Sequence, residues 1–426
     1  MGGKITRGIL QSKTYLLLLL VELATFIITS FWGLYFQAPS VVKFIFSISI
    51  WVSVLFFPFV FIRKNDFGRI ANYILFVILF LGIIAILRSC FNFEASLYAF
   101  GNKWLTLFLN EYCALLFVPP LFSYIAIHVR SLFYLKLLIS LYLVLCFPFF
   151  NYSSQNLFFI VIVLAPFFPY LTYFFRILVF VVIVKALFFS FFGQNPTRAM
   201  ILYVSFSVLA YILAYVIEKD FFKKILIVVT LSVIFIFYIP LLNNIGDDGI
   251  FVKFQDYMLS HNESRELSTD TRTFLYQELS EDLRNTKSFL FGKGALAYYY
   301  SFFFDSGING RYGRMASEVT FLNWLLHGGL IYVFFYYSLM FYAAIKAILY
   351  GKNRFVKCIA VVIIGWIFNS FICDMNGARF YHIVFFVLLG CCLSKRWLNY
   401  SDRQVQYIMS GSFFRNRKSL IVKKKV

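Results

Sequence analysis

Long apolar runs separated by short polar segments make up most of the chain from residue 14 to residue 395. A membrane-spanning helix needs about 20 mostly apolar residues, because it rises about 1.5 Å per residue through a hydrocarbon layer about 30 Å thick. The pattern predicts an all-α polytopic membrane protein with about twelve spans. The approximate spans are 14–36, 41–62, 70–90, 108–128, 132–150, 156–170, 172–192, 199–217, 224–242, 318–345, 355–374 and 378–395. Only Pro166 and Pro169 separate the sixth span from the seventh, and one kinked helix there would reduce the count to eleven.

One segment of 75 residues, 243–317, breaks this pattern and holds 10 of the 19 acidic residues. Apolar residues recur on one face of part of it, which predicts an amphipathic helix over 270–287 that begins at Thr269 or Asp270. The residues on that face are Phe274, Leu275, Leu279 and Leu283. The chain therefore divides into four parts. They are spans one to nine (1–242), the large loop (243–317), spans ten to twelve (318–395) and a basic tail (396–426).

Composition agrees with a lipid environment. Hydrophobic residues make up 61% of the chain and charged residues 14%, whereas roughly a quarter of a soluble domain is charged, so a water-soluble enzyme is excluded. The net charge of +20 would suggest nucleic acid as a partner of a soluble protein. Here 24 of the 39 basic residues fall on one side of the predicted spans, and the short loops on the other side hold 5. This asymmetry places both termini in the cytoplasm and the large loop outside, and it needs no nucleic acid.

The seven cysteines lie in or at the edges of spans, and none lies in the large loop. We therefore expect no disulfide framework and no cysteine-based metal site there; buried cysteine acts as a small apolar residue. No strong metal-ligand spacing occurs elsewhere, so neither a metal nor a cofactor is predicted.

Arginines gather on the predicted outer side. Arg88, Arg198 and Arg379 lie at the outer ends of spans. Guanidinium groups suit a diphosphate, because each donates two parallel hydrogen bonds and stays charged. The large loop adds Arg272, Arg284, Arg311 and Arg314.

The stretch from the loop into the tenth span contains the remaining candidates. Gly292 and Gly294 predict a tight turn with positive φ whose backbone amides approach a ligand. The match of this turn to a dinucleotide fingerprint is discounted, because no βαβ unit follows it. Glu318 is either a helix-start acid favoured by the helix dipole or a general base, and His327 reads as a packed polar side chain. Tyrosines near the turn stack on sugar rings or anchor the membrane interface. They are Tyr298, Tyr299, Tyr300 and Tyr312.

In this order and spacing, the motifs resemble the bacterial Wzy family of O-antigen and capsule repeat-unit polymerases, relatives of the O-antigen ligases. The resemblance covers the span count and the single large outer loop late in the chain. It also covers short motifs: an arginine early in the loop, an F-G-x-G turn, an acid opening the next span and a glycine-rich run. Here these are Arg272, Phe291 to Gly294, Glu318, and Gly328 with Gly329. The ligases usually have histidine in place of Glu318, which favours a polymerase.

The resemblance implies a metal-independent, cofactor-free glycosyltransferase on the outer face of the bacterial cytoplasmic membrane. It would move a growing glycan from undecaprenyl diphosphate to a sugar hydroxyl of an incoming lipid-linked repeat unit. Arg272 and the other outer arginines would bind the diphosphate, and a partly buried Glu318 would take the acceptor proton. Besides the lipid bilayer, a flippase and a chain-length regulator are the implied partners. Two alternatives remain: a flippase for the same lipid-linked unit, which has no need of so large an outer loop, and a ligase.

Overall fold

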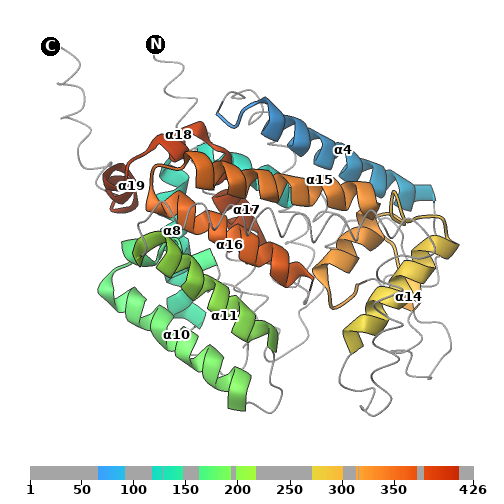
Figure 1. The fold of residues 1–426 in the computed structure, drawn as a ribbon, viewed down its shortest axis with the longest axis horizontal. Coiled ribbons are helices and arrows are strands. Elements are labelled where there is room, and N and C mark those ends of the chain that lie inside the picture. The colour runs from blue at the N-terminus through green and yellow to red at the C-terminus, as the bar shows by residue number, and fades with distance from the viewer. Residues whose placement is uncertain are drawn as a thin grey trace.

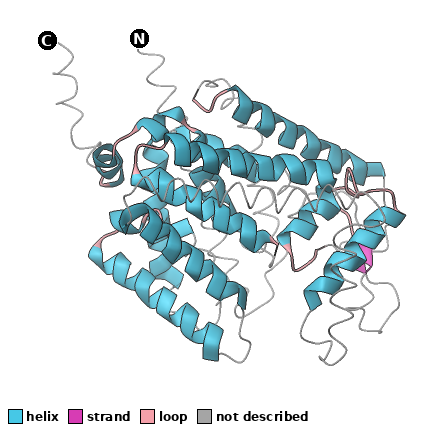
Figure 2. Cartoon of the chain, viewed as in Figure 1, coloured by secondary structure: helices cyan, strands magenta, loops and turns pink. Residues whose placement is uncertain are grey.

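The computed structural model describes residues 66–91, 118–127, 129–146, 163–192, 198–216, 271–300, 313–314, 316–371 and 379–411. This part of the chain is all-helical apart from one antiparallel ladder of two residues per strand (Figure 2). The ladder pairs β1 (Tyr299–Tyr300) with β2 (Gly313–Arg314).

The helices are named as in Figure 1. The longer ones are α4 (Arg69–Phe91), α8 (Val129–Cys146), α10 (Tyr173–Phe192), α11 (Arg198–Tyr211), α14 (Thr271–Asn285), α15 (Thr320–Tyr350), α16 (Arg354–Ser370) and α17 (Arg379–Leu393). The shorter ones are α7 (Val118–Phe122), η2 (Ser123–Ile127), η4 (Phe168–Tyr170), the π-helical η5 (Ile212–Val216), α18 (Lys395–Asn399) and α19 (Asp402–Met409).

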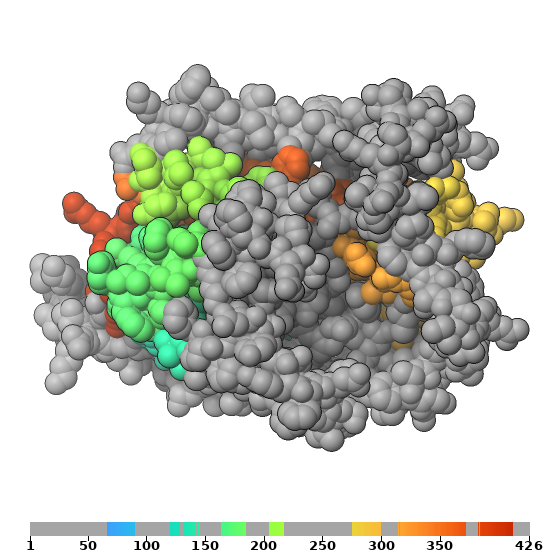
Figure 3. Space-filling view, turned by 90° about the horizontal axis from the view of Figure 1, so that it is seen from below, coloured from blue at the N-terminus to red at the C-terminus, as the bar shows by residue number. Residues whose placement is uncertain are grey.

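Helix α15 lies at the centre of the described bundle and packs against α4, α16 and α17 (Figure 1). It is buried along most of its length, as expected of a helix that is apolar on every face. Helix α11 approaches α16 closely at Gly365, where an added Cβ would lie 2.8 Å from the Phe206 ring. Figure 3 shows α10 and α11 in green on one side of the molecule and α14 in yellow on the other.

The bundle has two chemically different ends. At one end, the Lys346 ammonium donates to the carbonyls of Phe67 and Leu393, which joins the end of α15 to α4 and α17. At the same end the Asp66 carboxylate accepts from the Ser394 hydroxyl, and from the Arg396 amide at 3.2 Å. The opposite end holds α14, the last turn of α4 and the start of α15 (Figure 1). Helices α15, α16 and α17 alternate in direction between these two ends (Figure 1).

Two helices among the described residues are long and apolar enough to cross a membrane, Arg69–Ser89 and Thr320–Tyr350. The number is three if the bent pair Pro120–Ile127 and Ser131–Leu141 forms one span. Shorter apolar helices cover Tyr173–Val184, Val204–Val216 and Val384–Leu393. The predicted spans 14–36, 41–62 and 224–242 lie outside the described residues.

The predicted span 318–345 corresponds to α15, which is not one continuous helix. Gly329 has φ 77° and ψ 179°, and this non-helical residue divides α15 into 320–328 and 330–350. The apolar pattern runs on through the break, so hydrophobicity alone does not reveal it. The chain also leaves α-helical conformation between 165 and 172, where η4 contains Pro169. The sixth and seventh predicted spans are therefore not one continuous helix.

Candidate functional site

A turn of the large loop fills the break in α15. In an unbroken helix, the amides of Leu330 and Ile331 would bond to the carbonyls of residues 326 and 327. Instead, Leu330 donates to the Phe289 carbonyl at 2.9 Å and Ile331 to the Leu290 carbonyl at 3.1 Å. The two carbonyls freed on α15 accept from the turn. The Leu326 carbonyl takes the Lys293 amide at 2.7 Å, and the His327 carbonyl takes the Gly294 amide at 3.2 Å. The turn thus replaces two helical hydrogen bonds with four of its own, so the amides of Leu330 and Ile331 and the carbonyls of Leu326 and His327 are all paired.

Glycine is required where the turn meets the break. A Cβ on Gly329 would lie 2.2 Å from the Gly292 amide nitrogen, and a Cβ on Gly292 would lie 2.6 Å from the Gly329 nitrogen. The predicted positive φ is confirmed, at +67° for Gly292 and +106° for Gly294. Our expectation for the amides is corrected: both glycines are buried, and the Gly294 amide bonds to α15 instead of facing a ligand.

The other edge of the turn is held by the last turns of α4. The Ala295 amide donates to the Ala85 carbonyl at 3.0 Å, and the Leu296 amide donates to the Ser89 hydroxyl at 2.9 Å. Arg88, which is partly exposed, lies on this stretch of α4. Arg88, which we predicted to bind the diphosphate, therefore lies within one helical turn of Ala85 and Ser89, the two residues that hold the loop.

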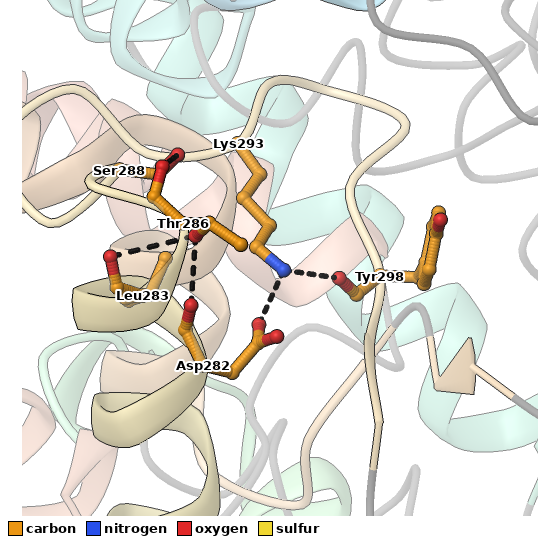
Figure 4. Close-up of polar contacts among 6 residues, drawn as sticks. All are labelled: Asp282, Leu283, Thr286, Ser288, Lys293 and Tyr298. Carbon is orange, nitrogen blue, oxygen red and sulfur yellow. Dashed lines mark hydrogen bonds and ion pairs between the residues drawn. The ribbon is translucent and has the colours of Figure 1, made fainter.

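Helix α14 is locked to the same turn by an ion pair (Figure 4). The Lys293 ammonium contacts the Asp282 carboxylate and donates to the Tyr298 carbonyl at 3.3 Å. It also lies 5.9 Å from the centre of the Tyr298 ring. The predicted helix over 270–287 is confirmed as α14, and three of its four predicted apolar residues are fully buried: Leu275, Leu279 and Leu283. The partly buried Tyr298 ring has a cation beside it and is not freely open to a sugar.

Glu318 and Arg314 lie together where α15 begins. A guanidinium nitrogen of Arg314 is 3.7 Å from a Glu318 carboxylate oxygen, and the two side chains are 28% and 54% exposed. The β ladder pairs Arg314 with Tyr299, and the strand that contains Tyr299 packs against α14. We expected Glu318 to be partly buried, as suits a base, and that expectation is corrected: the carboxylate is open to solvent.

Tyr299, the ladder partner of Arg314, is fully buried. Burial raises the pKa of its phenol to about 12, against an opposing effect of the Arg314 guanidinium. The carboxylates of Glu278 and Glu318 add to the increase. The phenol is therefore neutral at physiological pH. We call Glu318, Arg314, Tyr299 and Glu278 the carboxylate cluster.

The remaining predicted arginines lie on described helices, except Arg311, which lies outside the described residues. Arg284 is partly buried in the last turn of α14. Arg272 lies in the first turn of α14, and Arg198 and Arg379 begin α11 and α17, at the same end of the bundle as α14. Arg311 and Tyr312 lie outside the described residues. In the part of the chain that the structure describes, no group of three or more His, Cys, Asp or Glu residues could hold a metal ion.

The sequence reasoning missed several polar residues. Asn323 is fully buried and bonds to both backbone groups of Ser317. His382 is also fully buried, with Nε2 3.1 Å from the Tyr336 hydroxyl. A signal existed for both, since a polar side chain within an apolar span must find a partner. His327 is confirmed as packed, with Nδ1 3.1 Å from the Gly294 carbonyl.

No protein-family model, curated protein or solved structure matches this chain at a significant level.

Proposed function

We propose that this chain is a polymerase of bacterial surface polysaccharide, O-antigen or capsule, in the cytoplasmic membrane. It would transfer a growing glycan from undecaprenyl diphosphate to an incoming lipid-linked repeat unit on the outer face. Twelve spans and cytoplasmic termini are part of the proposal. The order of motifs that resembles the Wzy family supports it, together with the arrangement at the start of α15.

Outward-facing apolar side chains support the membrane part of the proposal. On α4, Tyr73, Phe76 and Phe80 recur on one face and are each more than half exposed. On α10, Phe174 and Phe180 are also more than half exposed. Apolar surface in water costs about 25 cal/mol per Å², and large exposed apolar patches mark membrane or partner contacts. A lipid surrounding removes this cost for both helices at once.

The contact between Glu318 and Arg314 carries the functional part. An exposed carboxylate lies beside a guanidinium group, at the head of a helix whose break is closed by the loop. Within a membrane, non-helical backbone is tolerated where other protein groups pair with its amides and carbonyls. The turn at 289–294 provides such partners for the break in α15. A base and a cation at one edge of the bundle are what transfer from a lipid diphosphate requires.

In the proposed step, the acceptor hydroxyl oxygen attacks the anomeric carbon of the growing glycan. The hydroxyl proton passes to the Glu318 carboxylate as the new glycosidic bond forms. The bond from the anomeric carbon to the diphosphate oxygen breaks, and undecaprenyl diphosphate leaves with the electron pair. Arg314, with Arg88, Arg272, Arg198 and Arg379 at the same end, would stabilise the charge that grows on the leaving group.

Replacing Glu318 by Gln tests this role. In a host that lacks the gene, complementation with the Glu318→Gln variant should leave surface lipid with a single repeat unit, because the amide cannot take the proton. The measurement is the ladder of glycan lengths on a gel, at matched protein levels. Glu281→Gln is the control, since Glu281 is an exposed acid on α14 that bonds to Gln277. It should restore full-length glycan.

The outcomes separate the proposal from its alternatives. Wild-type glycan lengths with Glu318→Gln would contradict the role of Glu318. In the deletion host, repeat units trapped on the inner leaflet would indicate a flippase, and long glycan left on the lipid carrier would indicate a ligase. Single repeat units on the outer face support a polymerase.

A further inference from the structure

Asn323 forms a reciprocal pair with the backbone on the N-terminal side of Glu318. Its side-chain oxygen accepts from the Ser317 amide at 2.6 Å, and its side-chain nitrogen donates to the Ser317 carbonyl at 2.9 Å. The side chain of Asn323 is fully buried. One amide side chain thus satisfies both backbone groups of a residue six positions earlier.

The start of α15 depends on these bonds. Its N-cap residue is Val319, which offers no capping side chain. The Val319 amide donates to the Ser317 hydroxyl at 3.2 Å, so the segment is held by Ser317 and Asn323 instead. Leaving the two buried backbone groups of Ser317 unpaired would destabilise the segment, because a buried donor or acceptor without a partner has lost its hydration. Asn323 therefore determines where the chain lies as it enters the helix.

This anchoring sets the direction of Glu318. Ser317 and Val319 are buried, and Glu318 between them is exposed. Side chains alternate along extended backbone, and Val319 is extended, with φ −128° and ψ 120°. Fixing Ser317 and Val319 in the interior holds the Glu318 carboxylate outward, where it reaches Arg314.

We infer that Asn323 is a positioning residue for Glu318, and that it holds the carboxylate in register with Arg314 and the acceptor hydroxyl. The inference rests on the proposed function. Asn323 does not reach the reacting atoms and acts through the backbone of Ser317.

The test replaces Asn323 by Asp. The aspartate side chain has the same size and can still accept the hydrogen bond from the Ser317 amide. It places an oxygen in place of the nitrogen that donates to the Ser317 carbonyl, so that hydrogen bond is lost and two oxygens repel each other. In membranes from the complemented deletion host, supplied with the host's own lipid-linked repeat unit, kcat should fall about 10²-fold. KM should change less than about twofold, because substrate binding is retained.

Asn353→Asp is the matched control. Asn353 is also fully buried, and its side chain also bonds to backbone, accepting from the Val356 amide and donating to the Trp397 and Tyr400 carbonyls. It lies at the opposite end of the bundle. The control should lower thermal stability as much as Asn323→Asp does and leave kcat within about threefold of wild type, which separates positioning from general destabilisation.

A double variant completes the test. On a Glu318→Gln background, Asn323→Asp should cause no further loss of residual turnover, since the group it positions has gone. An additional loss there, equal losses of kcat in Asn323→Asp and Asn353→Asp, or a fully active Asn323→Asp would overturn the role of Asn323. Full activity of Glu318→Gln alone would instead overturn the proposed function.

Discussion

At the scale of single residues, Tyr299 is the fully buried polar side chain of the carboxylate cluster. Tyr299 has no exposed surface, and its phenol is close enough to Arg314 and Glu318 for their charges to act on its pKa. A tyrosine in the unfolded chain has a pKa near 10, whereas burial raises the pKa of Tyr299 to about 12. A group with a raised folded pKa keeps its proton longer in the folded state, so its contribution to stability is lost as the pH rises.

The pH dependence of stability gives a direct prediction. Below about pH 10 the phenol is neutral in both states, and between about pH 10 and pH 12 the unfolded state loses its proton first. The loss should approach about 2–3 kcal/mol at pH 12, at about 1.4 kcal/mol per pKa unit. Melting curves of the detergent-solubilised protein should therefore show a steeper alkaline decline for wild type than for Tyr299→Phe. Parallel declines would contradict the burial of this phenol.

For single residues, the sequence identified which residues belong to the candidate site better than it predicted how exposed they are. Glu318 and Arg314 were both proposed from their positions, and the structure brings them into contact. The exposure of Glu318 was mispredicted, because it depends on Asn323 holding the neighbouring backbone inward. A reciprocal bond between an amide side chain and a backbone six residues away leaves no mark on hydrophobic periodicity.

At the scale of elements, the break in α15 depends on one glycine. A Cβ on Gly329 would meet three backbone atoms of the turn, of Gly292, Phe291 and Leu290, at 2.2 to 2.5 Å. Backbone cannot rotate away as a side chain can, so the turn would have to leave the break. Its four hydrogen bonds to α15 would then be lost together.

Gly329→Ala should therefore destabilise the protein by about 3 kcal/mol or more. Gly68→Ala is the matched control: Gly68 also has a positive φ, +92°, with nothing within 4 Å of an added Cβ. It should cost only the backbone strain, about 1–2 kcal/mol. Thermal unfolding of both variants in one detergent provides the comparison. Equal losses would show that the turn does not fill the break.

Helix α14 could be predicted from the sequence, whereas the break in α15 could not. The leucines of α14 recur at helical spacing against polar neighbours, and that contrast revealed the helix and its buried face. Within α15 apolar residues flank the Gly328–Gly329 pair on both sides, and the one polar neighbour, His327, is itself buried, so the pattern offers no contrast. The break is a tertiary feature, because the partner that stabilises it lies about 35 residues earlier in the chain.

At the scale of the whole molecule, the two ends of the bundle differ in charge. One end has mostly basic exposed residues, including Lys352 and Lys395, and at the other end α14 adds exposed acids such as Glu281 to the arginines. The proposed topology assigns the first end to the cytoplasm and the second to the outer face. Positive charge on the cytoplasmic side is the pattern expected of membrane proteins.

Cysteine labelling tests this orientation. A membrane-impermeant maleimide should label Glu281→Cys in intact cells, and it should label Lys352→Cys only after the cells are made permeable. The native cysteines among the described residues whose side chains are placed, Cys358, Cys391 and Cys392, are buried and should stay unlabelled in the parent protein. Labelling of both introduced cysteines from the same side would contradict the arrangement.

The hydrogen bonds between the turn and the helices also determine whether an isolated fragment of the large loop can serve as an immunogen. Four of the turn's backbone hydrogen bonds end on α15 and two end on α4, and neither helix belongs to the loop. A synthetic or secreted fragment covering 243–317 would lose all six to water. Antibodies raised against such a fragment would meet a different shape on the intact protein, so immunogens for this surface should present the loop together with its helices.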